Sequence, residues 1–110
     1  MKRVIMPLIL ILAAGPALAS PIGVWRVQDG SANVRIRRCG HDLCGVTGKE
    51  PVLKSMRATA QNQWTGKIWD ARSGQQYDGV ISLLSENALR VHGCVEGGGP
   101  CGDQTWTRVK

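Results

Sequence analysis

Hydrophobic and polar residues alternate along most of the chain after residue 20. In the segment 34–37, two apolar residues alternate with two arginines, a period of two that is typical of a β-strand with one buried face. The pattern predicts a protein built from short strands that each turn one face to a core. Strands are expected in the segments 23–27, 34–37, 43–47, 64–68, 77–83, 89–91 and 104–109.

Turn-forming residues separate these segments. The pairs at 29–30, 73–74 and 86–87 and the run 97–100 supply residues that adopt positive φ or interrupt a strand ladder. Because the connections are short, neighbouring strands should pair antiparallel. Seven or eight short strands without a long helix predict an all-β fold, a small antiparallel barrel or sandwich.

The segment 49–63 is the exception to this pattern. It includes Glu50 followed by Pro51 and lacks a clean alternation of apolar and polar residues. We expect at most a short helical turn near 53–60. Whether the chain forms seven or eight strands depends on this segment.

Residues 1–19 have the features of an export signal. Basic residues precede an apolar run, and a small-x-small pattern predicts cleavage after Ala19. The run is shorter than the roughly 20 apolar residues that span a bilayer, so we expect no membrane span in the mature chain. Ser20 follows the cleavage point in place of the cysteine that a lipid anchor needs. The mature protein is expected to be a single domain, residues 20–110, in the bacterial periplasm or secreted.

The chain is basic, with a formal net charge of +6 at pH 7. Its only dense basic cluster is Arg35, Arg37 and Arg38, and no aromatic residue that stacks on bases is interleaved with it. We therefore expect no nucleic-acid partner. The three arginines are predicted to form a solvated strand face, and attraction to anionic envelope surfaces is the functional alternative.

The two ends of the mature chain carry a tryptophan and an arginine that a barrel would bring together. Trp25 lies in the first predicted strand, and Arg108 shares a strand face with Trp106 in the last. If these strands are adjacent, as barrel closure requires, Arg108 can lie over the Trp25 indole in a cation–π contact. The pair resembles the Gly-x-Trp and terminal arginine of lipocalin-like barrels, and it favours a barrel over a sandwich.

A longer resemblance covers most of the mature chain. The segments GVW, VRIRRCGHDLCG, GKIWDARSGQQYDG, LRVHGC and QTWTRV, in this order, are similar to a bacterial exported family known as domain-of-unknown-function family 2147. The resemblance implies a small lipocalin-like β-barrel, an exported location and no established activity or catalytic residue. Two features depart from the family: a short link from Val46 to Gln63, and a second cysteine pair around a glycine-rich loop.

Four cysteines in a small exported domain indicate disulfide bonds. A local pairing joins Cys39 to Cys44 and Cys94 to Cys101, whereas a crossed pairing such as Cys39 to Cys94 closes a longer loop. Loop entropy favours the crossed bridge, at about 4 kcal/mol against about 2.2 kcal/mol for a six-residue loop. Oxidation of neighbours across a formed hairpin needs no rearrangement, so we predict the local pairing.

Metal, redox and catalytic chemistries are disfavoured. A histidine lies two residues from a cysteine at His41 and at His92, but neither spacing matches the usual zinc motifs, and an oxidising compartment competes for the thiols. There is no Cys-x-x-Cys redox motif and no serine in a nucleophile-elbow pattern. Asp70 and Asp78 are the nearest candidates for paired carboxylates, and Asp70 is expected to cap a turn. We therefore expect a protein that is not an enzyme and holds no cofactor or metal.

The sequence predicts an exported binding module. A small apolar or amphipathic ligand in the barrel mouth would contact some of four aromatic side chains, although plain core packing accounts for the same residues. The alternative is a surface-recognition protein whose basic strand face binds an envelope polymer, an anionic lipid or a partner protein. The candidate ligand-binding residues are Trp64, Trp69, Tyr77 and Trp106.

Overall fold

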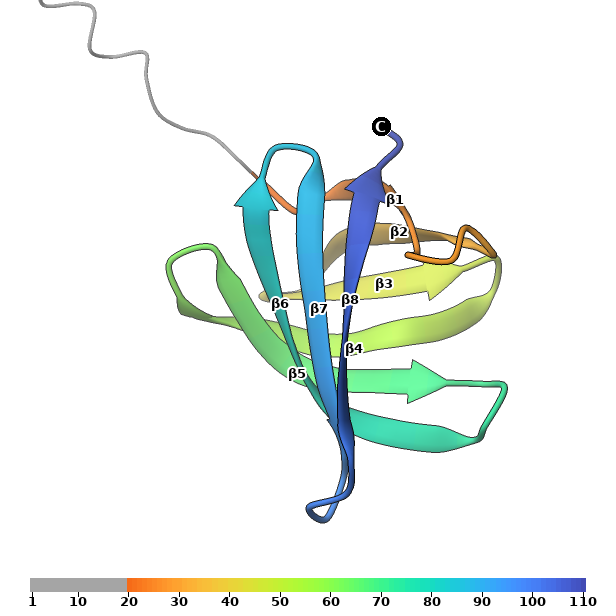
Figure 1. Ribbon diagram of the computed structural model, residues 1–110. Helices are drawn as coiled ribbons and strands as arrows, with labels where there is room; N and C mark the ends of the chain where they lie inside the picture. The colour runs from red at the N-terminus through yellow and green to blue at the C-terminus, as the bar shows by residue number, and fades with distance from the viewer. Residues whose placement is uncertain (1–19) are drawn as a thin grey trace, which may run out of the picture.

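The computed structural model describes residues 20–110, which form eight strands and no helix (Figure 1). The predicted export signal, residues 1–19, lies outside the described residues. No helix that could span a membrane occurs in the described part of the chain. The strands are β1 (Gly23–Arg26), β2 (Asn33–Cys39), β3 (Asp42–Thr47), β4 (Glu50–Ala60), β5 (Gln63–Asp70), β6 (Gln75–Ser85), β7 (Ala88–Val95) and β8 (Cys101–Arg108).

The strands close into a barrel in which each one pairs with the next in the chain. The barrel is completed by β1 and β8, which run antiparallel with Trp25 opposite Arg108 and Arg26 opposite Thr107. All other neighbouring pairs are antiparallel as well. The all-β class and the closed antiparallel barrel predicted from the sequence are confirmed, with eight strands.

The segment 53–60, where the sequence allowed a helical turn, is part of the long strand β4. Its alternation is broken by an irregularity between Lys54 and Arg57, where the register against β5 shifts. Ser55 takes a positive φ of 52° within this irregularity. A β-bulge adds residues to one strand and bends it, so the apolar residues of a bulged strand no longer fall on a period of two.

The core fills the barrel with side chains from the inward-facing positions of the strands. No polar or charged side chain among residues 20–110 is buried, so the interior is entirely apolar. Inward-facing glycines make room where strands approach closely, as at Gly66, where an added Cβ would lie 2.6 Å from two backbone oxygens of the β4 bulge. The buried cluster consists of Trp25, Val34, Ile36, Leu43, Leu53, Met56, Ile81, Leu83, Leu89, Val91 and Trp106.

One end of the barrel is closed by Arg108. Its guanidinium lies over the fully buried Trp25 ring, with Cζ 4.4 Å from the ring centroid. It also donates hydrogen bonds to three backbone carbonyl groups, those of Glu86 at 2.6 Å, Ile22 at 3.0 Å and Ser20 at 2.6 Å. These contacts join the β6–β7 turn and the segment before β1 to the last strand. They lie at one end of the barrel and do not cover the opposite end.

Both disulfides join neighbouring strands, so the predicted local pairing is confirmed. Cys39 and Cys44 are bonded diagonally across the β2–β3 hairpin, because the residue directly opposite Cys39 is Asp42. Cys94 and Cys101 are bonded directly across β7 and β8, where they face each other in register. The crossed pairings considered from chain entropy are not formed.

Candidate ligand-binding cavity

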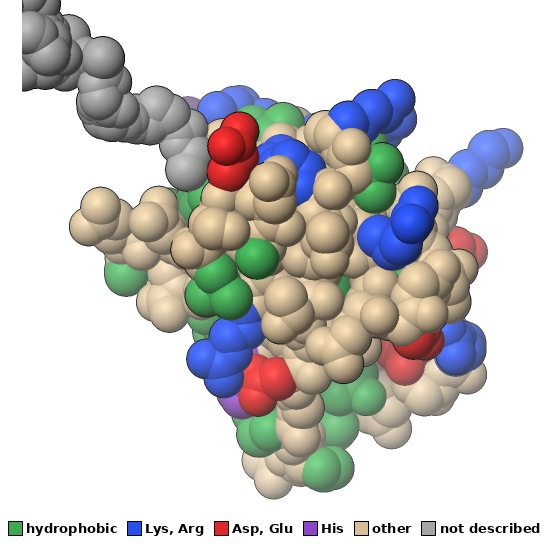
Figure 2. All heavy atoms as spheres, turned by 45° about the horizontal axis from the view of Figure 1, so that its top comes forward, with side chains coloured by type: hydrophobic (Ala, Val, Ile, Leu, Met, Phe, Trp, Pro, Cys, Tyr) green, Lys and Arg blue, Asp and Glu red, His purple; other side chains and the backbone are tan. Residues whose placement is uncertain are grey.

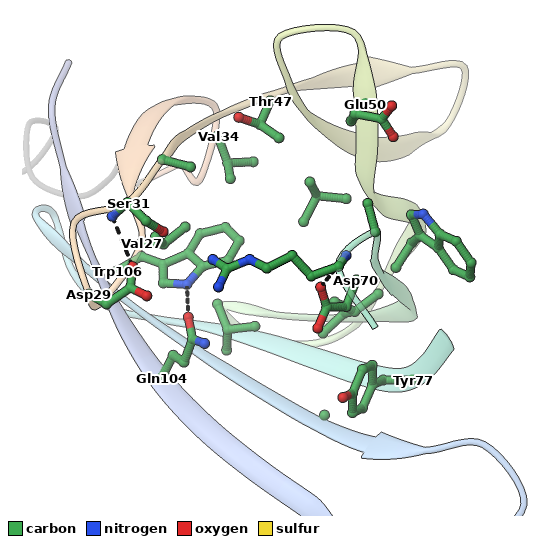
Figure 3. A pocket seen from close by; sticks show the side chains of 18 of the residues that line it. Val27, Asp29, Ser31, Val34, Thr47, Glu50, Asp70, Tyr77, Gln104 and Trp106 are labelled. Atoms are coloured by element: carbon green, nitrogen blue, oxygen red, sulfur yellow. Dashed lines mark hydrogen bonds between the residues drawn. The ribbon is translucent and has the colours of Figure 1, made fainter. Parts of the chain in front are cut away.

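A cavity of about 560 Å³ opens at the barrel end opposite Arg108. Figure 3 shows side chains that line it. It is bordered by the connections β1–β2, β3–β4 and β5–β6 and by the facing parts of β7 and β8. Strand alternation explains why this end is hollow. The inward positions of β7 and β8 are held here by Gly93 and Gly102. The space beside Gly93 is taken by Tyr77 and Ile68, whose side chains would lie 3.3 and 3.5 Å from an added Cβ, whereas nothing lies within 4 Å of a Cβ built on Gly102.

The floor of the cavity is apolar. Side chains from β1–β2, β4, β5, β6, β7 and β8 reach it because the inward positions of these strands carry hydrophobic residues. Such a floor takes up the apolar part of a ligand by removing its surface from water. The apolar and aromatic residues that line the cavity include Val27, Val34, Val52, Ile68, Tyr77, Val91 and Trp106.

Trp106 is the largest side chain of this floor and is held in a fixed orientation. Its indole Nε1 donates a hydrogen bond of 2.8 Å to Oε1 of Gln104, two residues earlier on the same face of β8 (Figure 3). The ring is only 3% exposed. Because its single donor is already bonded, Trp106 can offer an incoming ligand the apolar surface of its ring.

Charged side chains gather at the mouth. Asp29 accepts a 2.9 Å hydrogen bond from the backbone N–H of Ser31, and hydrogen bonds from Ser31, with a smaller contribution from the positive charge of Arg72, lower the pKa of Asp29. Asp70 caps the β5–β6 turn, accepting from the backbone N–H of Arg72 at 3.0 Å and from the Ser73 hydroxyl at 3.1 Å. The cavity thus has an apolar floor and a polar, charged mouth.

Three of the four aromatic residues singled out from the sequence line this cavity: Trp69, Tyr77 and Trp106. Trp69 lies on the strand face opposite Ile68, and the ammonium group of Lys54 lies 5.3 Å from its ring centroid. Trp64 is not among the lining residues; it packs against the buried core.

Sequence reasoning singled out Asp70 as a turn cap, which the structure shows, but it did not single out Gly102 inside the cavity or Asp29 and Arg72 at its mouth. A glycine at an inward position of a strand is the signal that could have indicated a hollow, because it removes a side chain from the interior. Arg72 and Asp29 lie in turns, where polar residues are expected whether or not a site is present.

The basic residues Arg35, Arg37 and Arg38 are exposed on β2. Within the described residues 20–110, none of the three takes part in an ion pair. On the face of the molecule seen in Figure 2, basic side chains lie at several separate places with acidic ones between them. The arginines of β2 are therefore exposed and have no ion-pair partner among the described residues. The face drawn in Figure 2 has no continuous basic surface.

The remaining polar candidates do not come together as the catalytic hypotheses would require. Asp70 caps its own turn, whereas Asp78 forms an ion pair with Lys67. His92, Cys94 and Cys101 are the set of possible metal ligands found among residues 20–110, with their ligand atoms within 4.8 Å of one another. Both sulfur atoms of this set are joined in a disulfide, which leaves only the imidazole as a ligand.

Comparison with known proteins agrees with this architecture. A family described as "Uncharacterized protein conserved in bacteria (DUF2147)" matches residues 46–108. The chain belongs to this family. The match begins within β3 and runs through the end of β8, so it includes the strands that supply most of the cavity.

A solved structure has the same fold. Protein HP1028 from Helicobacter pylori, which is described as belonging to the lipocalin family, superimposes with a TM-score of 0.72 at 12% sequence identity. The superposition covers 84% of this chain and 85% of that protein. At this level of identity the likeness shows a lipocalin-like barrel and nothing about a ligand. No curated protein matches the chain.

Proposed function

We propose that this protein is an exported, non-catalytic binding module that holds a small apolar or amphipathic ligand in the open end of its barrel. The observation that supports this most is the cavity of about 560 Å³, which is within the range of about 300–1,000 Å³ usual for small-molecule sites. The lipocalin-like fold and membership of a bacterial family without a described activity agree with a binding role.

The distribution of polarity supports an amphipathic ligand. Val34, Val91 and Trp106 would contact its apolar part, and the turn carrying Arg72 and the loop carrying Asp29 would contact its polar end. Apolar burial supplies affinity at about 25 cal/mol per Å², while a few polar groups fix orientation.

The test is a variant that fills the cavity without disturbing the barrel. Gly102→Leu places a side chain where a Cβ meets no atom within 4 Å, at a position whose φ is compatible with any residue. The matched control is Thr105→Leu, an exposed position on the same strand and the opposite face. Binding of the neutral fluorophore N-phenyl-1-naphthylamine is titrated against wild type and both variants.

We expect Gly102→Leu to weaken binding of this fluorophore at least about tenfold. The leucine side chain occupies space that the ligand would fill, and the apolar burial lost by the ligand is worth about 1.5–3 kcal/mol of binding free energy. Thr105→Leu should bind as wild type does. If all three proteins bind with equal affinity, or if wild type binds no probe at all, the cavity is not a ligand site. Thermal unfolding of each variant checks that the barrel is intact.

Export is the second part of the proposal. Local disulfides persist in oxidising compartments, and the family is bacterial. After expression in a bacterial host, the denatured mass of the periplasmic protein should equal that of residues 20–110 less four hydrogens. A cytoplasmic protein of full length, or one with four free thiols, would refute this part.

A surface-recognition role is the alternative, and the observation that favours it is the exposed trio Arg35, Arg37 and Arg38 without ion pairs. It predicts binding to anionic vesicles that weakens in high salt and in the double variant Arg35→Ala with Arg37→Ala. A salt-independent affinity unaffected by this double variant would exclude it.

A further inference from the structure

The disulfide Cys94–Cys101 is placed at an exposed tip of the barrel. The hairpin of β7 and β8 projects beyond the neighbouring strands, and this disulfide crosses it next to the connecting loop (Figure 1). Cys101 is exposed and Cys94 is half-buried. A thiol approaching from solvent therefore reaches the sulfur of Cys101 more easily than that of Cys94.

An imidazole lies beside the less accessible sulfur. His92 is two residues before Cys94 on β7, so both side chains point to the same outer face of the barrel. Nε2 of His92 is 3.6 Å from Sγ of Cys94. The ring is therefore within hydrogen-bond reach of the sulfur that would leave if a thiol attacked Cys101.

A carboxylate fixes this imidazole. Asp103 is opposite His92 in the register of β7 and β8, and its Oδ1 is 2.8 Å from Nδ1 of His92. Arg90 also donates to this carboxylate from the same face, with Nε at 3.1 Å. The hydrogen bond with His92 is the main reason why the pKa of Asp103 is lowered. With Nδ1 bonded to this carboxylate, the ring is held with Nε2 toward Sγ of Cys94.

We propose that Cys94–Cys101 is a thiol-exchange site, in which an external thiol attacks Cys101, His92 stabilises the departing thiolate of Cys94, and Asp103 positions the ring. The substrate class is a small or protein-borne thiol or its disulfide. Asp103 borders the ligand cavity. The inference does not depend on a ligand there, since the side chains of His92, Cys94, Cys101 and Asp103 lie on the outer face of β7 and β8.

The exchange balances in two steps. The first RSH passes its proton to the imidazole of His92, and the resulting RS⁻ attacks Sγ of Cys101. The S–S bond to Cys94 breaks, and the departing Cys94 thiolate takes that proton from the ring, which returns to its starting state. A second RSH then attacks the sulfur of R in the mixed disulfide, giving RSSR and the Cys101 thiol. Two RSH are oxidised to RSSR while one disulfide is reduced to a dithiol, and the reverse direction oxidises an incoming dithiol.

The second disulfide lacks this arrangement and serves as an internal control. Cys39 and Cys44 are half-buried, and among residues 20–110 no imidazole is hydrogen-bonded to either sulfur. The absence of a Cys-x-x-Cys motif spoke against redox chemistry from sequence alone. The trio of His92, Cys94 and Asp103 is assembled by strand register, which such a motif does not capture.

The experiment incubates the folded protein with reduced glutathione at pH 7, quenches with an alkylating reagent, and follows each disulfide by peptide mass spectrometry. In wild type we expect Cys94–Cys101 to open faster than Cys39–Cys44, with the first glutathione adduct on Cys101. His92→Ala should slow this opening about tenfold. This factor is smaller than the contribution of most positioned acids, because a thiolate is a good leaving group even without protonation. The rate at Cys39–Cys44 should not change.

Asp103 is tested as a positioning residue by Asp103→Asn, which should slow the opening of Cys94–Cys101, and by Asp103→Glu, which should restore part of the rate. Circular dichroism and thermal unfolding verify that each variant is folded. An equal opening rate in wild type and in folded His92→Ala protein would overturn the proposal. So would a first adduct on Cys94, or equal slowing of both disulfides.

Discussion

The guanidinium of Arg108 lies over the indole of Trp25, 4.4 Å from the ring centroid, at the point where the last strand meets the first. Only two residue pairs join β1 to β8, which is the shortest seam of the barrel. Trp25 adds a 2.8 Å hydrogen bond from Nε1 to the carbonyl of Pro21. Backbone hydrogen bonds of Val24 with Val109, at 2.7 Å, and with Lys110, at 2.6 Å, extend the seam beyond the end of β8. One arginine and one tryptophan thus reinforce a short seam with their side chains.

The first prediction concerns this seam. Arg108→Ala removes the cation–π contact and three hydrogen bonds to backbone carbonyls, and we expect the free energy of unfolding to fall by about 2 kcal/mol. Arg108→Lys keeps the charge without the planar fork and should lose part of this amount. Urea unfolding measures both variants. Wild-type stability in Arg108→Ala would show that the seam does not depend on this residue.

The second prediction concerns the close approach of β4 and β5. Gly66→Ala would place Cβ 2.6 Å from the carbonyl oxygens of Lys54 and Ser55, so the bulge must shift, at a cost of about 1–3 kcal/mol. Gly102→Ala is the control, because its Cβ meets no atom within 4 Å. Thermal unfolding should separate the two variants; equal melting temperatures would contradict the described bulge.

The third prediction is a loss of stability in acid. Hydrogen bonds from Lys67 first and Gln76 second lower the pKa of Glu96 in the folded protein. A lowered folded pKa means that the contribution of Glu96 is complete above its unfolded value of about 4.3 and is lost as the pH falls through the folded value. The free energy of unfolding should therefore decrease as the pH falls below about 4.

Glu96→Gln provides the control for the acid prediction. Its stability should depend less on pH between about 5 and 3, and the difference from wild type should shrink in high salt because the group is exposed. The measurement is urea unfolding across this pH range at two salt concentrations. Parallel pH curves for wild type and variant would show that Glu96 contributes nothing to the acid response.

Much of the fold could be predicted because period-two alternation reports directly on which strand face is buried. The β2 segment shows this, with Val34 and Ile36 buried and the arginines between them exposed. The same reasoning failed for the segment 53–60, where a bulge around Ser55 breaks the period. A bulge is set by contacts with the neighbouring strand, here the close approach of Gly66, and local sequence does not specify them.

The sequence predicted that aromatic side chains face the barrel interior, but it did not predict which of them lie at the cavity. Alternation separates inside from outside, but it does not tell how far along the barrel axis a side chain lies. Trp64 is near the start of β5, next to the β4–β5 turn, and packs on the core, whereas Trp106 faces the cavity. The contact between His92 and Asp103 likewise depends on the register of two strands, which only the folded barrel fixes.

The measurement that tests the binding proposal most directly is native mass spectrometry of the mature protein purified from the periplasm, compared with Gly102→Leu purified in the same way. We predict that wild type carries an additional small-molecule mass and that Gly102→Leu, with its cavity filled, carries little or none. A wild-type protein that shows only its own mass, or an adduct retained equally by Gly102→Leu, would contradict a ligand in the barrel mouth.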